Sequence, residues 1–357
     1  MRSNAAPVNR HQEYQRMKAV TYTGERRFTL TDIEPEPVRP GSVRVEPAYV
    51  GLCGTDLHIF HGHMDSRVTK PAIIGHEMVG VITELGADVS GWNIGDVVTV
   101  MPLVWDNTCP ACQSGHSHIC QNLQFVGIDT AGALQQQWVV PSDLLVRVPE
   151  GVRLAHAALV EPVAVAVHDV RRSELTRGQQ AVVIGAGPIG VLIATVARSV
   201  GADVAVMELD PGRRALAQEL GLTTIDPSQV DPVAWVTEWT HGAGADVVFE
   251  VAGAAAAIRT ATNLAKVRGT VVVVAIHPEP RLVDLQRVFW RELRILGARV
   301  YQRTDFEEAV RLIEAGLIPA EQLITEIVPL NEVQSAFEKL EAGAALKVLI
   351  EVGGPQQ

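Results

Sequence analysis

The stretch from residue 17 to about 149 consists of short β-branched runs that glycine and proline separate. Such runs begin at Ser42, Val79, Asp96 and Trp138. Many short strands at close spacing, with turn residues between them, are typical of all-β sandwiches and barrels. This stretch therefore predicts a β-rich, barrel-like domain.

The pattern changes near residue 180, where runs of valine and isoleucine alternate with helical runs. The expected strands cover residues 181–185, 204–208, 246–251, 271–275 and 293–297. The expected helices between them cover 189–201, 213–220 and 255–265. Nearly continuous apolar strands that alternate with helices predict a parallel sheet covered on both faces.

The whole chain is therefore expected to have the α/β fold class, with a β-rich domain at 17–165 and a doubly wound parallel sheet at 166–302. The polar residues 1–16 lack periodicity, and we expect them to be a disordered extension or a tag. Residues 303–357 form a C-terminal segment. It is expected to contain helices at 305–315 and 331–340 and a strand at 346–352 that returns to the first domain.

The length and composition agree with two globular domains. The chain has 357 residues, about two domains by length, and 47% of them are hydrophobic. There are 30 lysines and arginines against 41 aspartates and glutamates, which gives a net charge of −11. Nucleic acids and anionic membrane surfaces do not attract an acidic protein, so we expect neither as a partner.

No segment favours a membrane or secretory destination. The most apolar stretch, residues 181–197, contains glycine and proline, which favour a buried strand, turn and helix over a membrane span. The N-terminal residues lack the apolar core of a signal peptide. Only four cysteines occur, which suits a reducing compartment. A cytoplasmic location is therefore expected.

A glycine-rich motif, Gly185-x-Gly187-Pro188-Ile189-Gly190, follows a predicted strand and opens a predicted helix. In that context its glycines allow a tight turn and a close approach of the backbone to a pyrophosphate at the helix N-terminus. The motif therefore predicts a dinucleotide-binding site.

An acidic residue points to the type of dinucleotide. Glu208 ends the next strand, 23 residues after Gly185, where a carboxylate accepts hydrogen bonds from ribose hydroxyls and repels a 2′-phosphate. This arrangement favours NAD over NADP. Arg213 and Arg214 lie nearby, and both would argue for a phosphate instead. The alternative is that they are solvated residues at the start of a helix, with Arg213 over the adenine.

Two further motifs give the chain a resemblance to a known family. They are Cys53-Gly-Thr55-Asp56-Leu-His58 and Gly75-His76-Glu77-Met-Val-Gly80, with Gly86 and Val89 beyond. Together with the glycine motif they resemble the zinc-dependent medium-chain dehydrogenase/reductase superfamily, over residues 17–352. The resemblance implies a GroES-like catalytic domain followed by a Rossmann domain, with the backbone of Ala275 and Ile276 facing the nicotinamide.

The donor types in these motifs suit a catalytic zinc. Cys53 offers a thiolate, His76 an imidazole, and Glu77 and Glu161 offer carboxylates. Ethanol-type members of the family have cysteine at the position of Glu161, so glutamate there resembles the polyol, threonine and butanediol branch. In that branch Glu77 and Glu161 alternate as direct ligand and water-mediated partner. Asp56 is expected to accept a hydrogen bond from the other ring nitrogen of His76.

The resemblance also implies a route for the proton. Zinc polarises a bound alcohol and lowers its pKa, and the hydride passes to the nicotinamide. Thr55 would accept the proton and pass it through the cofactor ribose to His58, which exchanges it with solvent. The alternative for His58 is an ordinary surface histidine.

Asp106, Cys109, Cys112 and Cys120 repeat the spacing of the family's structural zinc lobe, in which all four residues are cysteine. Asp106 replaces the first cysteine here. An aspartate oxygen can complete a tetrahedral site, and His116 or His118 are alternative fourth ligands. A lobe without metal, holding three reduced thiols, is the remaining alternative.

The leading prediction is an NAD-dependent zinc dehydrogenase that oxidises a secondary alcohol in a polyol, sugar or related small molecule. One alternative is L-threonine 3-dehydrogenase. Another is a non-catalytic regulatory protein that binds zinc and nucleotide. Because family members pair through the edge of the dinucleotide-domain sheet, we also expect a homo-oligomer, a tetramer or a dimer.

Overall fold

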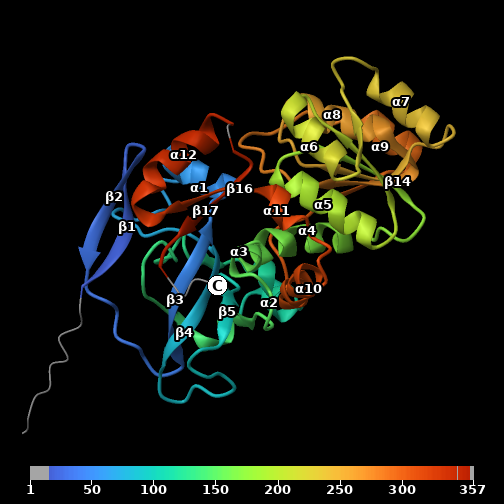
Figure 1. Cartoon of the computed structure of the whole chain (residues 1–357). Helices are drawn as coiled ribbons and strands as arrows, with labels where there is room; N and C mark the ends of the chain where they lie inside the picture. The colour runs from blue at the N-terminus through green and yellow to red at the C-terminus, as the bar shows by residue number, and fades with distance from the viewer. Residues whose placement is uncertain (1–15, 344, 354–357) are drawn as a thin grey trace, which may run out of the picture.

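The computed structural model describes residues 16–343 and 345–353, which form two bodies, each built around a sheet (Figure 1). The extension expected at 1–16 lies outside the described residues, apart from Arg16. No helix in the described part of the chain is long and apolar enough to cross a bilayer.

The first body contains a seven-stranded sheet whose main path runs in the order β16-β17-β3-β4-β5-β9, with β8 paired to β3. Its strands are β3 (Ser42–Gly51), β4 (Glu77–Leu85), β5 (Val97–Val100), β8 (Trp138–Pro141), β9 (Leu145–Arg147), β16 (Ile324–Pro329) and β17 (Lys347–Glu351). β17 pairs antiparallel with β3, so the last described strand lies beside one of the first. The tail thereby completes the sheet that the N-terminal residues begin.

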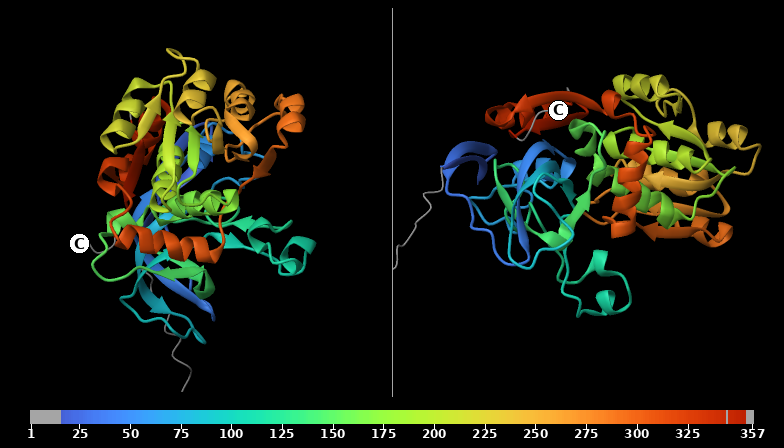
Figure 2. Two further views of the ribbon diagram at one scale, coloured as in Figure 1. Left: turned by 90° about the vertical axis from the view of Figure 1, so that its right-hand side faces the viewer. Right: turned by 60° about the horizontal axis from the view of Figure 1, so that its bottom comes forward.

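Smaller elements surround this sheet. They are the hairpin β1 (Met17–Gly24) and β2 (Arg27–Ile33), the pair β6 (Leu103–Val104) and β7 (Gln124–Phe125), and the helices α1 (Gly54–Phe60), α2 (Pro110–Gln113) and α3 (Leu154–Ala157). The residues between β6 and β7 form a lobe that projects from the body in both views of Figure 2. This cysteine lobe, residues 105–123, contains three of the four cysteines.

The second body contains a six-stranded parallel sheet in the order β12-β11-β10-β13-β14-β15. Its strands are β10 (Gln180–Ile184), β11 (Asp203–Met207), β12 (Thr223–Ile225), β13 (Ala245–Glu250), β14 (Ala265–Val273) and β15 (Arg294–Gly297). Numbered along the chain this is 3-2-1-4-5-6, the order of doubly wound dinucleotide-binding sheets. The predicted parallel sheet is confirmed.

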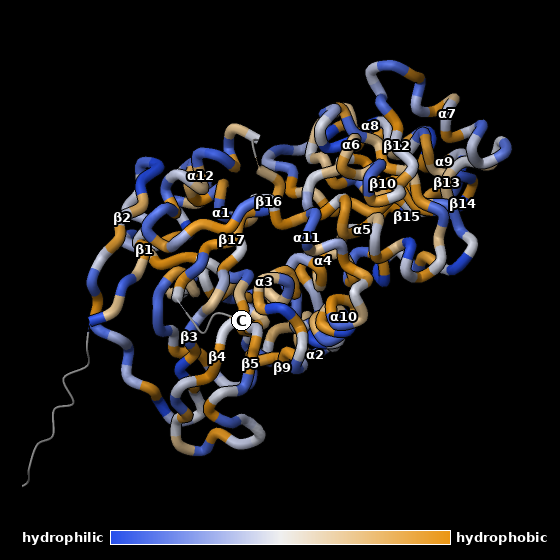
Figure 3. The backbone as a smooth tube through the Cα atoms, in the orientation of Figure 1, coloured by the Kyte–Doolittle hydropathy of each residue, from blue (hydrophilic) through white to orange (hydrophobic). Residues whose placement is uncertain are grey.

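Both faces of the parallel sheet are covered by helices. They are α5 (Pro188–Ser199), α6 (Pro211–Glu219), α7 (Pro232–Trp239), α8 (Ala255–Leu264) and α9 (Leu285–Arg291). Successive side chains of a strand point to opposite faces. Val183 accordingly lies in one apolar cluster and Val182 in another, which also contains Ala261 of α8. The apolar strands at the centre of this body are visible in Figure 3.

Helix α4 (Val160–Ser173) lies between the two bodies and packs against α5 and α10 (Arg303–Glu314). The boundary expected between residues 165 and 166 falls inside this helix, so the chain passes from one body to the other along a continuous helix. The tail is completed by α11 (Ala320–Leu323) and α12 (Val333–Glu341), which packs on α1.

Candidate active site and cofactor cradle

Three of the predicted zinc ligands meet beside the first sheet. Cys53 is the N-cap of α1, His76 directly precedes β4, and Glu77 begins that strand. The Cys53 Sγ and His76 Nε2 atoms are 3.2 Å apart, and the donor atoms of all three residues lie within 4.8 Å of one another. His76 and Glu77 are buried, so the cluster is shielded from bulk water.

The local sequence fixes the position of Cys53. Its side chain accepts a hydrogen bond from the Thr55 backbone, and the Asp56 carboxylate accepts one from the backbone of Cys53 at 3.0 Å. This reciprocal arrangement is a capping box, which satisfies donors at the helix start. The same hydrogen bonds aim the sulfur at His76.

Glu161 approaches the cluster from the first turn of α4 and is anchored by a residue that the sequence did not reveal. Its Oε1 accepts a hydrogen bond of 2.7 Å from the hydroxyl of the fully buried Tyr301. Burial, opposed by His76 and reinforced by Glu77, raises the pKa of Glu161 to about 7. Glu161 therefore lies within electrostatic reach of both residues, although it is outside the group of three.

Glu77 has a buried cationic partner that also escaped sequence analysis. Lys347, the first residue of β17, donates from Nζ to Glu77 Oε2 at 2.5 Å and to the carbonyl oxygen of Leu52 at 3.0 Å. Both charged groups are almost fully buried. Burial alone would lower the pKa of Lys347, but Glu77 and the Cys53 side chain raise it above its usual value. A methyl group at Gly51 would overlap the Glu77 carboxylate, so glycine is required beneath the pair.

The expected hydrogen bond between His76 and Asp56 is absent. His76 Nδ1 and Asp56 Oδ1 are 3.6 Å apart, which exceeds hydrogen-bond length. Among the described residues neither atom has a hydrogen-bond partner. Burial raises the pKa of Asp56, while Cys53 and Asp56 raise that of His76 against the opposing effect of burial.

The donor set fits zinc. A tetrahedral ion with bonds of about 2.3 Å to sulfur and 2.0–2.1 Å to nitrogen places those two atoms about 3.5 Å apart. The observed 3.2 Å between Cys53 and His76 requires little adjustment. The orphaned His76 Nδ1 is also the atom through which a second group would orient a ligating imidazole.

Thr55 and His58 occupy successive turns of α1, next to Cys53. Thr55 is half-buried and His58 is exposed. Residues three apart lie on the same side of a helix. The two side chains therefore lead from the cluster towards solvent, which is the direction that the predicted proton route needs.

The cysteine lobe brings its four predicted ligands together. Donor atoms of Asp106, Cys109, Cys112 and Cys120 all lie within 4.8 Å of one another. The Cys109 sulfur is 3.5 Å from that of Cys112 and 3.7 Å from that of Cys120. Tetrahedral zinc holds sulfurs about 3.8 Å apart, so this set fits the ion as well.

The alternative fourth ligands of the lobe lie elsewhere. His116 contacts the Ser114 hydroxyl, and the ring of His118 packs against that of His168 on α4, with centroids 5.1 Å apart. His168 in turn contacts Asp305 of α10 at 2.9 Å. The Asp106 carboxylate accepts hydrogen bonds from Cys109 and Thr108, and these backbone groups lower its pKa.

The glycine motif forms the predicted turn between β10 and α5. Gly185 has φ +109°, a left-handed conformation that favours glycine. A methyl group at Gly190 would overlap the carbonyl oxygen of Gly185, so the third glycine permits helix and strand to approach. Gly187 is the N-cap of α5 and Pro188 its first residue, followed by Ile189.

The acidic residue after β11 lies against this turn. Glu208 accepts hydrogen bonds from the backbone of Ala186, Leu209 and Asp210, at 2.7–2.9 Å. Arg213 is exposed, whereas Arg214 forms an ion pair with Asp226, with Nη2 and Oδ2 2.7 Å apart.

The third predicted part of the cofactor site, Ala275 and Ile276, follows β14. The Ala275 backbone donates a hydrogen bond to Glu250, and Ile276 is 72% exposed. Gly185, Glu208 and Ala275 thus all follow strands at their carboxyl ends, the edge at which doubly wound sheets bind ligands.

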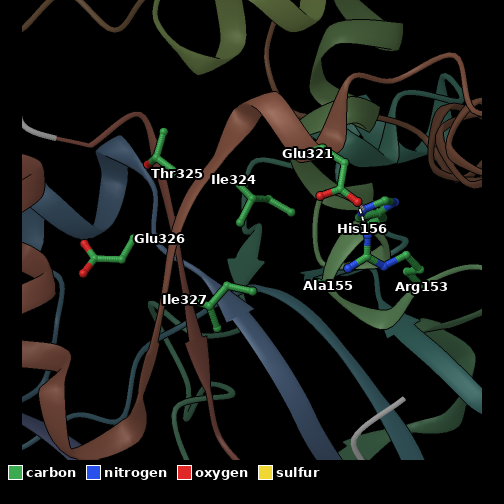
Figure 4. A pocket seen from close by; sticks show the side chains of 8 residues that line it. All are labelled: Arg153, Ala155, His156, Glu321, Ile324, Thr325, Glu326 and Ile327. Atoms are coloured by element: carbon green, nitrogen blue, oxygen red, sulfur yellow. Dashed lines mark hydrogen bonds and ion pairs between the residues drawn. The ribbon is translucent and has the colours of Figure 1, made fainter.

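A separate surface hollow of about 230 Å³ lies beside β16 (Figure 4). It is lined by Arg153, Ala155, His156, Glu321, Ile324, Thr325, Glu326 and Ile327. None of these belongs to the metal clusters or to the cofactor cradle. Within the hollow Glu321 already contacts Arg153 and His156.

Comparisons with known proteins agree with this geometry. A family model for the alcohol dehydrogenase GroES-like domain matches residues 39–150, and a model for zinc-binding dehydrogenases matches residues 188–315. A 2-dehydro-3-deoxy-L-galactonate 5-dehydrogenase of Pseudoalteromonas atlantica is 46% identical over 341 residues, 95% of this chain and 100% of the relative. A sorbitol dehydrogenase of Halalkalibacterium halodurans is 33% identical, over 94% of this chain and 99% of the relative.

The fold agrees with solved structures. The crystal structure of 2R,3R-butanediol dehydrogenase from Bacillus subtilis superimposes with a TM-score of 0.88 at 30% identity, covering 94% of this chain and 100% of that one. The predicted fold class, GroES-like plus Rossmann, is therefore confirmed. Full-length similarity and the two matched models show that the chain belongs to the zinc-dependent medium-chain dehydrogenase/reductase family.

Proposed function

We propose that the protein oxidises a secondary alcohol of a polyol, sugar or sugar acid, with zinc as Lewis acid and NAD as hydride acceptor. The family assignment makes it a dehydrogenase. The observation that carries the proposal is the buried group of Cys53, His76 and Glu77, with Glu161 beside it. The substrate class is supported by relatives named for sugar-acid and sorbitol dehydrogenation.

The residues of the site would have separate roles in metal binding, proton transfer and positioning. Cys53 and His76 would hold zinc, and Glu77 and Glu161 would supply carboxylate oxygens. When bound, zinc polarises the alcohol oxygen and makes its proton easier to remove. Thr55 would accept that proton and His58, on the next turn, would exchange it with solvent. Lys347 and Tyr301 would position the two glutamates.

NAD is the proposed cofactor because of Glu208. Its carboxylate is held beside the glycine turn by three backbone hydrogen bonds. A fixed negative charge there repels a 2′-phosphate. Gly185, Gly187 and Gly190 would take the pyrophosphate at the start of α5, Arg213 would cover the adenine, and the backbone at 275–276 would face the nicotinamide.

We further propose a second zinc in the cysteine lobe, held by Asp106 and the three thiolates. Four protein ligands would leave no open position, so this ion would order the lobe rather than react. The four reduced cysteines support a cytoplasmic location. The domain limits proposed from the sequence stay as proposals, with α4 as the connection.

A homo-oligomer, a tetramer or a dimer, is proposed from the edge of the parallel sheet. Strand β15 ends the sheet, and Leu285, Phe289 and Trp290 of the adjacent α9 are 70–73% exposed. Edge strands and large apolar patches are typical association surfaces. Light scattering is expected to give a multiple of the 38.5 kDa chain mass, and a monomer mass would refute this proposal.

The test of the function is NAD reduction against a panel of sugar acids, polyols, sugars, diols and threonine. We expect NADH formation with a sugar acid or polyol and a much lower rate with NADP. Turnover of threonine to a 3-oxo amino acid, with none of the others oxidised, would contradict the proposed substrate class. Tight NADH binding without any turnover would contradict catalysis altogether.

A further inference from the structure

Three histidines at the end of α1 form a cluster that the proposed reaction does not use in full. His58 lies in the last turn of the helix, and His61 and His63 follow in the next turn of the chain. The ring centroids of His58 and His63 are 5.6 Å apart, and those of His61 and His63 are 5.4 Å apart. His58 and His63 are exposed, so the cluster is open to solvent.

The spacing of the first pair matches a metal chelate. His58 Nδ1 and His63 Nδ1 are 3.3 Å apart. A direct N–H···N hydrogen bond of that length is long. A tetrahedral ion with metal–nitrogen bonds of 2.0–2.1 Å requires its two nitrogen ligands to lie about 3.3 Å apart. The two Nδ1 atoms are therefore already at the separation that such an ion spans.

The third histidine has a contact that favours the tautomer of a metal ligand. His61 Nε2 contacts a Glu341 carboxylate oxygen of α12 at 2.8 Å, and a carboxylate can only accept. Proton placement on Nε2 leaves the lone pair on Nδ1. Metal-binding histidines commonly donate their other ring N–H to a carboxylate in this way. Glu341 is itself paired with Arg26, which fixes it further.

We propose that His58, His61 and His63 form an additional site for a divalent transition metal such as Ni²⁺ or Zn²⁺, bound through their Nδ1 atoms. Imidazole nitrogens suit these ions. The Nδ1 atoms of His58 and His63 are already at the required separation. His61 lies outside the groups whose donor atoms are all within 4.8 Å of one another, so its side chain has to leave the Glu341 contact and turn towards the other two to become the third ligand.

An ion at this site would act on the enzyme. His58 is the residue proposed to accept the substrate proton and exchange it with solvent, and a metal on its Nδ1 atom would occupy a lone pair that the proton needs. Occupancy would therefore inhibit turnover without touching the catalytic zinc. This consequence, unlike the binding itself, rests on the proposed function.

The test is equilibrium dialysis of the zinc-loaded protein against Ni²⁺, with nickel and zinc measured in the same sample. Wild type is expected to bind one nickel per chain in excess of a His63→Gln variant, with zinc content unchanged. His241→Asn is the matched control, because His241 is an exposed histidine after α7 and its left-handed backbone suits asparagine. This control is expected to bind nickel as wild type does, and His61→Gln to bind it at least tenfold more weakly.

Equal nickel binding by wild type and His63→Gln would overturn the proposed site, as would an equal loss in the His241→Asn control. NADH formation gives a separate result. Nickel inhibition of wild type but not of His63→Gln supports the site and its link to His58. Nickel binding that leaves the rate unchanged supports the site and contradicts the role of His58, whereas absence of NADH formation without nickel contradicts only the proposed function.

Discussion

At the scale of single residues, the site depends on buried charges whose partners come from distant parts of the chain. Lys347 is 270 residues from Glu77, and Tyr301 is 140 residues from Glu161. Local motifs predicted Cys53, His76 and Glu77 because each motif carries its own spacing. Lys347 and Tyr301 belong to no local sequence motif, since only the tertiary fold brings them to the glutamates.

Replacing Lys347 tests the first anchor. Lys347→Met leaves the Glu77 carboxylate buried without its cation, and breaking a buried pair in this way costs about 3–5 kcal/mol. We expect urea unfolding of the metal-free protein to show a loss of that size. Lys347→Arg, which keeps the charge, is the control. A loss below about 1 kcal/mol in Lys347→Met would show that the pair contributes little.

Asp169 of α4 offers a pH test that is independent of the metal site. Burial, and then Asp305, raise the pKa of Asp169, and among the described residues neither of its oxygens has a hydrogen-bond partner. Because the folded pKa lies above the unfolded value of about 3.9, the unfolded chain releases this proton first. Rising pH above about 4 therefore favours unfolding until the folded pKa is passed.

Asp169→Asn removes this penalty. We expect a gain in melting temperature that is larger at pH 8 than at pH 5, measured by thermal unfolding at both values. An exposed substitution such as Asp203→Asn serves as the control, with no comparable trend. A gain that shrinks as the pH rises would show that the carboxylate is stabilised in the fold.

At the scale of elements, the sequence predicted the helices and strands whose apolar residues recur at a clear spacing. The expected helices at 189–201 and 255–265 correspond to α5 (Pro188–Ser199) and α8 (Ala255–Leu264). No bounds were predicted for α4, because its Val-Glu-Pro-Val-Ala-Val start is mostly apolar and rich in valine, as a buried strand would be. Pro162 is tolerated there since it lies in the first helical turn, where its missing N–H has no intrahelical partner.

The cysteine lobe is the element whose order should depend on metal. Asp106→Ala removes one of four ligands, so we expect the zinc content to fall from two to about one per chain, with a lower melting temperature. Asp106→Cys supplies a fourth sulfur and should keep both ions. Metal analysis that finds only one zinc in the wild-type protein would remove the second site.

At the scale of the whole molecule, the two glutamates of the candidate site meet their anchors only in the complete fold, because both anchors lie far along the chain. β17 carries Lys347 to Glu77, and the short segment that leads into α10 carries Tyr301 to Glu161. The sequence predicted the return of the closing strand from its β-like character, but not its register. Pairing with β3 sets that register, because Leu349 opposite Gly51 brings Lys347 close to Leu52 and Glu77.

Hydride transfer is expected to require the zinc held at Cys53 and His76 beside the two glutamates. The most direct test of this requirement is NADH formation by protein stripped with a chelator and then given back zinc, with the metal content followed in parallel. Loss of a Lewis acid worth several kcal/mol should lower the rate by about 100-fold or more, and zinc should restore it in wild type but not in Cys53→Ser. An unchanged rate in protein whose zinc has been removed would contradict the account.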